Sequence, residues 1–169
     1  MKPITFLVCI LSLLGLSCCS SKEKATLGPT AVKNIAVLTM DGNIPDKTAE
    51  QARELRITLE WMDHDLINTF NGSGLHTILL KERQDYNPEM GNLLIVDVER
   101  FNAGSRAARA FVGFGAGSAS LDLNYKLFDD KGALLSEWRD DVGSSKGAAY
   151  CAETLNKKAL EKVVTLLNR

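Results

Sequence analysis

The sequence predicts a single α+β domain in which about five strands form a mostly antiparallel sheet and two amphipathic helices pack on one face. Two segments repeat apolar residues at helical spacing, and a third alternates apolar and polar residues as a half-buried strand does. The order of these segments shows no internal repeat and no second domain. The chain has 169 residues, 45% of them hydrophobic, which suits one buried core and excludes intrinsic disorder.

The first predicted elements are a short strand and a long helix. The apolar run Ile35–Met40 predicts a buried strand, because turn residues follow it directly at Asp41-Gly42-Asn43. Thr48 with Gln51 three residues later forms a capping box, which marks the start of a helix. Apolar residues then recur at steps of three and four in one stripe: Leu55, Leu59, Met62, Leu66 and Phe70. Asn71-Gly72 is expected to end this helix as a left-handed cap.

Three kinds of signal predict the rest of the domain. Further strands are expected over these segments: Leu75–Glu82, Leu93–Phe101, Ser118–Phe128 and Leu134–Val142. Ser118–Phe128 is the clearest, because its apolar residues fall on one face and its polar residues on the other, as in antiparallel sheets. Asp129–Gly132 has hairpin-turn chemistry and joins the last two strands. Helical spacing of apolar residues over Ala148–Leu167 predicts the closing helix.

The N-terminus predicts export. Lys2 lies in a positively charged n-region, and Ile4–Leu16 is an apolar stretch interrupted only by small residues. Its length fits the h-region of a signal peptide and is too short to span a bilayer, which needs about 20 apolar residues. Residues 1–18 are therefore interpreted as a signal peptide.

The end of this segment, Leu16-Ser17-Cys18-Cys19, resembles the lipobox of bacterial lipoproteins, in which an apolar and two small residues precede a cysteine. The resemblance implies that the cysteine is lipidated and becomes the first residue. Cys19 has Leu16 at the required distance and is preferred, whereas Cys18 has Gly15 at the apolar position and is the alternative. Two or three acyl chains anchor a protein that a single chain would release. Ordinary secretory cleavage is the competing interpretation.

The lipobox resemblance also implies a location. Ser20 follows the preferred cysteine, whereas Asp there is the inner-membrane retention signal of many Gram-negative bacteria. We therefore expect the outer membrane, with the protein facing the periplasm, if the source is Gram-negative. Residues 19–33 form the lipidated N-terminus and a polar tether, whose flexible part of about 14 residues spans roughly 20 Å. Residues 34–169 form the folded domain.

A glycine-rich insert, Gly104–Gly117, joins two predicted strands and is the unusual part of the chain. Its last glycines stand at every second position, which allows close backbone approach or positive φ. A dinucleotide-binding loop needs G-x-G-x-x-G before a helix, whereas this insert has G-x-G-x-G before a strand, so we exclude that function.

Two interpretations of the insert remain. In one, the glycines shape a bulged corner where Arg109 binds backbone carbonyls. In the other, Phe111, Val112 and Phe114 form an apolar rim beside Arg106 and Arg109, and this rim contacts a protein partner or membrane headgroups. The second makes these residues a candidate interaction loop: Arg106, Arg109, Phe111, Gly113, Phe114, Gly115 and Gly117.

The stretch from Gly104 to Phe128 resembles a bacterial lipoprotein family catalogued as domain of unknown function 4410. In that family a Gly-x-x-x-x-Arg turn runs into V-G-F-G-A-G and then into an alternating strand that ends in a D-x-x-G hairpin. The matching positions here are Gly104, Arg109, Gly113, Gly115, Gly117 and the Asp129–Gly132 turn. The resemblance implies an exported, lipid-anchored α+β domain and no particular activity.

The sequence contains no catalytic constellation, and we predict no cofactor and no metal. Asp63-His64-Asp65 resembles a ligand triplet only in composition, because adjacent helical residues point in different directions. Cys151, at the start of a helix, is expected to be a small buried residue. The 20 basic and 21 acidic residues give a net charge of -1, which argues against a nucleic-acid partner.

These observations predict a non-enzymatic lipoprotein that acts as an interaction or assembly module of the cell envelope, held by its N-terminal lipid and bound to a protein partner. A small-molecule or glycan-binding protein in the same place is the alternative, and a pocket lined by Trp61, Trp138 or Tyr125 would favour it. A hydrolase is the third hypothesis, and it requires a His/Asp/Glu cluster assembled by folding.

Overall fold

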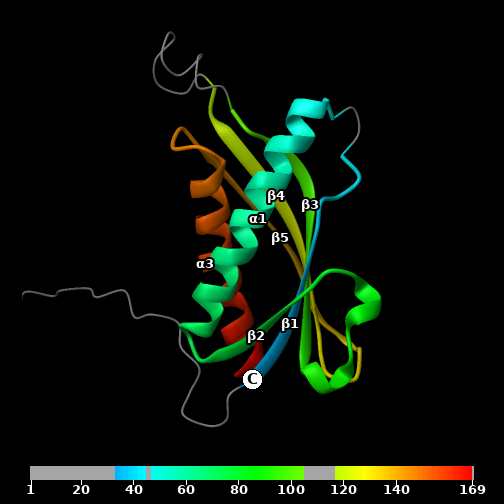
Figure 1. Ribbon diagram of the computed structural model, residues 1–169. Helices are drawn as coiled ribbons and strands as arrows, with labels where there is room; N and C mark the ends of the chain where they lie inside the picture. The colour runs from blue at the N-terminus through cyan, green and yellow to red at the C-terminus, as the bar shows by residue number, and fades with distance from the viewer. Residues whose placement is uncertain (1–32, 45–46, 105–116, 169) are drawn as a thin grey trace, which may run out of the picture.

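The computed structural model describes residues 33–44, 47–104 and 117–168 (Figure 1). Its elements follow in this order: β1 (Lys33–Met40), α1 (Ala49–Asn71), β2 (Leu75–Leu80), the 3-10 turns η1 (Arg83–Asp85) and η2 (Pro88–Met90), β3 (Asn92–Asn102), β4 (Ala119–Phe128), β5 (Leu134–Ser144) and α3 (Ala148–Leu167). The predicted order of strands and helices is confirmed, and each strand ends within two residues of its predicted bounds.

The strands form one five-stranded sheet in the order β2-β1-β3-β4-β5. β3 with β4 and β4 with β5 pair as antiparallel ladders, which are the longest in the sheet. β1 is parallel to both of its neighbours, β2 and β3. Parallel neighbours need a crossover connection, and α1 supplies it between β1 and β2. The predicted α+β class is therefore confirmed, and the sheet is mixed on the β1 side.

Both helices pack on one face of the sheet, as predicted (Figure 1). The α1 stripe from Leu55 to Phe70 is buried, and α3 contributes a second buried stripe. The facing side chains of β4 are all buried: Ala119, Leu121, Leu123, Tyr125 and Leu127. Each fully buried Leu or Phe side chain contributes about 1.5–3 kcal/mol to stability, so this face holds most of the core.

A smaller apolar cluster lies on the opposite face of the sheet. Its buried members are Ala36, Leu38, Leu80 and Leu93. Tyr86 and Met90, from the β2–β3 connection, pack against it. The Tyr86 hydroxyl donates to the Gly91 carbonyl at 2.7 Å, which fixes this connection over the strands. α1 and the β2–β3 connection therefore cover opposite faces of the sheet.

The start of α1 matches the prediction, whereas its end does not. The Gln51 N–H donates to Thr48 Oγ1 at 3.2 Å, and the Thr48 N–H donates to Gln51 Oε1 at 3.0 Å, which completes the capping box. The predicted left-handed cap at Gly72 is wrong, because Gly72 has a right-handed φ of -63°. The N–H groups of Ser73 and Gly74 donate to the carbonyls of the last helical residues, Phe70 and Asn71. The left-handed residue is Gly74, with φ +95°.

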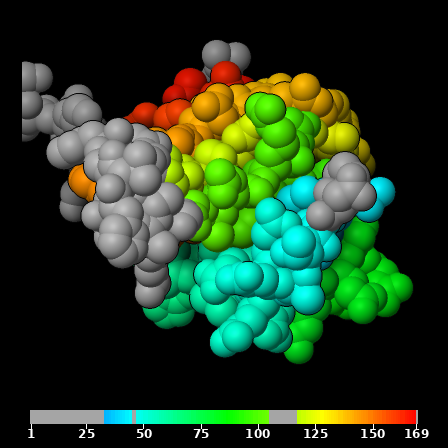
Figure 2. Space-filling model, turned by 90° about the horizontal axis from the view of Figure 1, so that it is seen from above, coloured from blue at the N-terminus to red at the C-terminus, as the bar shows by residue number. Residues whose placement is uncertain are grey.

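The domain has two ends that matter for function. At the proximal end β1 and β3 begin and both helices end; the Lys33 ammonium donates to the Leu167 carbonyl there. At the distal end β3 ends, β4 begins and both helices begin (Figure 1). Figure 2 looks down onto the distal end. β3 has 11 residues, so at about 3.3 Å per residue the two ends lie about 35 Å apart.

Candidate functional site

A groove of about 780 Å³ opens at the distal end, between α1 and the start of α3. Its α1 wall includes Glu50, Glu54, Ile57 and Trp61, and its other walls are formed by residues 102–104 and 146–149. This volume is in the range of sites that hold a small molecule or the side chains of another protein.

Helical spacing explains the α1 wall. Glu50, Glu54, Ile57 and Trp61 recur at steps of four, three and four, so they share one side of the helix. This side differs from the buried stripe and leaves large apolar side chains in water, with Ile57 46% and Trp61 39% exposed. Apolar side chains gathered beside a groove with a polar rim are typical of a contact surface for another molecule.

The glycine-rich insert that carries the predicted interaction loop starts at the rim of this groove, at Gly104. Gly104, which lines the groove, and Gly117 have positive φ values of +73° and +71°. A Cβ on Gly104 would stand 2.4 Å from the Gly117 carbonyl oxygen, so the two ends of the loop are in contact. The rest of the predicted interaction loop lies outside the described residues: Arg106, Arg109, Phe111, Gly113, Phe114 and Gly115.

The charges on the described walls are mostly acidic. Glu50 and Glu54 are exposed on α1. Lys146 is the cation among the lining residues, and its ammonium lies 4.3 Å from the centre of the Tyr150 ring. Among the described residues, neither Glu50 nor Glu54 forms an ion pair, so the α1 wall presents two exposed carboxylates beside its apolar side chains.

Only one of the three aromatic residues that the sequence associates with a ligand pocket lies on this groove. Trp61 lines it, whereas Tyr125 is fully buried in the main core. Trp138 stacks on Tyr125, with ring centres 5.0 Å apart and planes 9° from parallel. Tyr125 and Trp138 therefore stabilise the β4–β5 pair.

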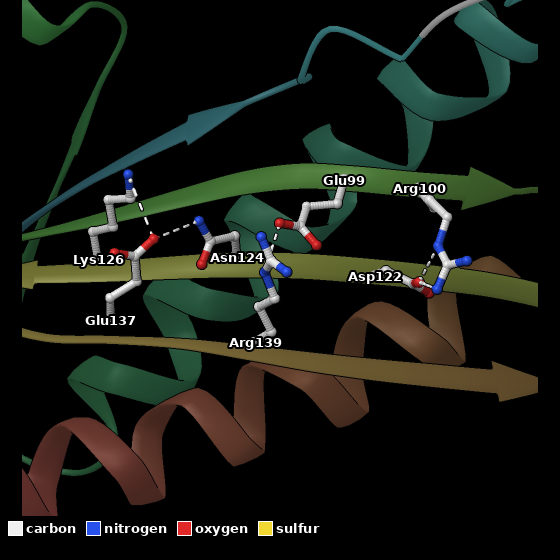
Figure 3. Close-up of polar contacts among 7 residues, drawn as sticks. All are labelled: Glu99, Arg100, Asp122, Asn124, Lys126, Glu137 and Arg139. Atoms are coloured by element: carbon white, nitrogen blue, oxygen red, sulfur yellow. Dashed lines mark hydrogen bonds and ion pairs between the residues drawn. The ribbon is translucent and has the colours of Figure 1, made fainter.

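The face of β3, β4 and β5 turned away from the helices carries ion pairs between neighbouring strands (Figure 3). The pairs are Arg100–Asp122, Glu99–Arg139 and Lys126–Glu137, with N–O distances of 2.5, 2.8 and 3.5 Å. The Asn124 amide also donates to Glu137 at 3.0 Å. This confirms the polar face predicted for β4. Exposed pairs each contribute about 0–1 kcal/mol, and because these charges compensate one another, the surface is a solvated face.

The structure separates the members of the Asp63-His64-Asp65 triplet, as predicted. Asp63 accepts a hydrogen bond from the Thr39 hydroxyl at 2.6 Å. His64 Nδ1 lies 3.2 Å from the Asn68 amide. Asp65 accepts from the Asn156 amide of α3 at 2.8 Å. Within residues 33–44, 47–104 and 117–168, no group of three or more His, Cys, Asp or Glu side chains is placed to hold a metal ion.

Cys151 is buried, as predicted, and its Sγ lies 3.7 Å from the Ala119 carbonyl oxygen. Burial raises the pKa of the Cys151 thiol, which disfavours the reactive thiolate. The thiol therefore fills space between α3 and β4.

In the described part of the chain, no helix is both long and apolar enough to cross a membrane.

The sequence profile of a family described as a domain of unknown function, DUF4410, matches residues 22–163. The chain belongs to this family. The match covers β1 to most of α3, so the groove of this DUF4410 chain lies within the family's domain. No curated protein matches the chain.

Solved structures with a similar arrangement are distant. A point variant of the PelC dodecamer from Paraburkholderia phytofirmans is 13% identical, with 80% of this chain and 90% of that one covered and a TM-score of 0.49. A putative neuraminyllactose-binding hemagglutinin homolog from Helicobacter pylori is 9% identical, with coverages of 87% and 88% and a TM-score of 0.36. An uncharacterized lipoprotein B from Nitrosomonas europaea is 12% identical, with coverages of 87% and 84% and a TM-score of 0.25.

Proposed function

We propose that this DUF4410 chain is a lipid-anchored, periplasm-facing protein of the outer membrane whose distal end binds another protein of the cell envelope. The position of the groove supports this proposal. The chain enters the domain at Lys33, at the proximal end, whereas the groove lies about 35 Å away at the distal end. A lipid on Cys19 would hold the proximal end near the membrane.

The predicted tether favours a protein partner over membrane headgroups. Its flexible part of about 14 residues spans roughly 20 Å, which is less than the length of the domain. In the orientation where the tether is relaxed, the distal end therefore points away from the lipid. The candidate interaction loop would then meet a partner in the periplasm.

The groove also suggests the chemistry of that partner. Ile57 and Trp61 would bury an apolar anchor, and aromatic residues at the centre of an interface commonly contribute most of its binding energy. Glu50 and Glu54 would attract basic groups around that anchor. We propose a partner segment in which one apolar side chain is flanked by Lys or Arg.

Crosslinking in cells, followed by mass spectrometry, tests the groove. The groove variant carries Ile57→Ser and Trp61→Ser. The control carries Leu134→Ser and Leu135→Ser, which are exposed at the proximal start of β5 to a similar extent, 51% and 46%. We expect the groove variant to lose a partner that the intact protein and the control retain. Equal loss in both variants, or retention in the groove variant, would contradict the proposal.

Two further variants test the remaining parts of the proposal. Phe114→Ser combined with Arg106→Ala should reduce partner crosslinking without unfolding the domain; unfolding alone would support the bulged-corner interpretation. Replacing both Cys18 and Cys19 with Ala should abolish metabolic acyl labelling, and continued labelling would rule out the lipid anchor.

A further inference from the structure

A second cleft lies beyond the ends of β1 and β2, beside α1. α1 leaves the end of β1 on one face of the sheet, whereas the β2–β3 connection leaves the end of β2 on the other. In open sheets with parallel strands, ligands bind in crevices outside the carboxyl ends of the strands. β1 and β2 are parallel neighbours, so their carboxyl ends lie at the same edge of the sheet.

The structure has a cleft of about 740 Å³ at this position. Its walls are the end of β1, residues 81–83 after β2, and one side of α1. Seven charged side chains line it: Asp41, Arg56, Glu60, Asp63, Lys81, Glu82 and Arg83. Asp41 pairs with Lys47 at 3.7 Å, and Glu82 accepts a hydrogen bond from Gln84. Glu60 is an exposed carboxylate, whereas Asp63 is the half-buried one and faces the same cleft as Arg56 and Lys81.

Asp63 is a half-buried carboxylate without a counter-ion among the described residues. The Thr39 hydroxyl donates to it at 2.6 Å, and no described Lys, Arg or His lies within ion-pair distance. Burial raises the pKa of the Asp63 carboxyl, and the Thr39 hydrogen bond opposes this only in part. A desolvated carboxylate of this kind is stabilised by a cation that a ligand brings.

Arg56 and Lys81 supply positive charge on two walls of the same cleft. Neither forms an ion pair with a described residue, whereas the neighbouring Arg83 lies over the Tyr86 ring at 5.2 Å. Arg56 and Asp63 are seven residues apart on one side of α1, which separates their backbones by about 10 Å. An extended dipeptide, at about 3.5 Å per residue, spans a comparable length once the side chains reach toward it.

We infer that this cleft binds a short zwitterionic peptide, with its ammonium group on Asp63 and its carboxylate between Arg56 and Lys81. β1 runs two residues beyond its last pair with β2, Leu38↔Leu80, and backbone groups on that side can bond the peptide unit. This inference is independent of the proposed function, because the distal groove and this cleft use different residues of α1.

Calorimetric titration of the full chain in detergent micelles tests the inference with three probes. These are alanyl-alanine, its N-acetyl derivative and its C-terminal amide. We expect saturable binding of alanyl-alanine, and affinity at least about tenfold weaker for each blocked form, as expected when one charge-assisted contact is lost.

Matched variants assign the two contacts. Asp63→Asn should remove the preference for the free amine, and Arg56→Gln with Lys81→Gln should remove the preference for the free carboxylate. Arg53→Gln, on an exposed part of α1 outside the cleft, should leave both preferences intact. Thermal melts show that each variant is folded.

Three results would overturn the inference: no saturable binding of alanyl-alanine, equal binding of the blocked peptides, or an undiminished amine preference in a folded Asp63→Asn variant. Partner crosslinking through the distal groove would be unaffected by any of them, so the two proposals fail separately.

Discussion

Gly104 and Gly117 meet at the distal end so closely that a Cβ on Gly104 would stand 2.4 Å from the Gly117 carbonyl oxygen. The contact brings together the end of β3 and the chain just before β4, and it sets the point where the candidate interaction loop leaves the domain. The loop's position therefore depends on two glycines that the described structure constrains.

Gly104→Ala should destabilise the domain more than a glycine replacement elsewhere. Both Gly104 and Gly132 have positive φ, of +73° and +80°, which costs about 1–2 kcal/mol for an Ala. A Cβ on Gly132 meets nothing within 4 Å, so Gly132→Ala is the matched control. We expect urea unfolding to show a loss of about 1 kcal/mol for the control and clearly more for Gly104→Ala. Equal losses would mean that the Gly104–Gly117 contact is not tight.

Asn156→Ala should weaken the contact between α1 and α3 and so destabilise the domain. Asn156 is 1% exposed, and its amide donates to the Met62 carbonyl at 2.9 Å and to Asp65 at 2.8 Å. Removal deletes both hydrogen bonds and leaves the half-buried Asp65 carboxylate without this donor, so we expect a loss of about 2 kcal/mol in the free energy of unfolding. Asn68→Ala, at an exposed site on α1, should change it by less than about 0.5 kcal/mol. Similar losses in the two variants would argue against the buried bonds.

Asp63→Asn should stabilise the folded protein at neutral pH and not in acid. Burial raises the pKa of Asp63 above its ordinary value of 3.8 in the folded state. The folded chain therefore holds this proton to higher pH than the unfolded chain, and stability falls as pH rises from 3.8 through the folded pKa. The variant lacks this penalty. Melting temperatures should thus favour Asp63→Asn at pH 7, with the difference vanishing below pH 3.8; a difference independent of pH would refute this.

The processed protein should show one free thiol, and only after unfolding. In the proposed processing, Cys9 and Cys18 would leave with the signal peptide and Cys19 would carry the lipid, which would leave Cys151 as the free thiol. Because Cys151 is fully buried and its pKa is raised, its reaction with a thiol reagent should be slow in the folded state. Addition of denaturant should expose one thiol per chain. A second thiol would show that Cys18 or Cys19 is retained without lipid.

Local patterns predicted most of the elements, because their causes lie within a few residues. The stripe from Leu55 to Phe70 follows helical spacing, and the alternation from Ala119 to Leu127 follows strand geometry. The parallel pairing of β1 depends on which strands become its neighbours. The local sign of it is the unbroken apolar run Ile35–Leu38, which is typical of strands in parallel sheets. In the structure these residues are buried on both faces of the sheet.

The candidate sites were harder to predict, because distant segments form them. Trp61 and Ile57 are ordinary exposed residues of α1 until the start of α3 lies beside them. Asp63 acquires its burial and its Thr39 contact from β1. The end of α1 shows the same limit on a small scale: Gly72 and Gly74 both suit a left-handed turn, and contacts around Ser73 decide between them.

Site-specific photo-crosslinking in living cells tests whether the distal groove binds another envelope protein. One variant carries a crosslinking residue in place of Glu54, in the distal groove, and the other carries it in place of Lys131, in the β4–β5 hairpin at the proximal end. Both positions are exposed, so the two probes are matched in access. We expect a discrete envelope-protein adduct from position 54 and none from position 131. The same adduct from both positions, or an adduct from position 131 alone, would contradict this expectation.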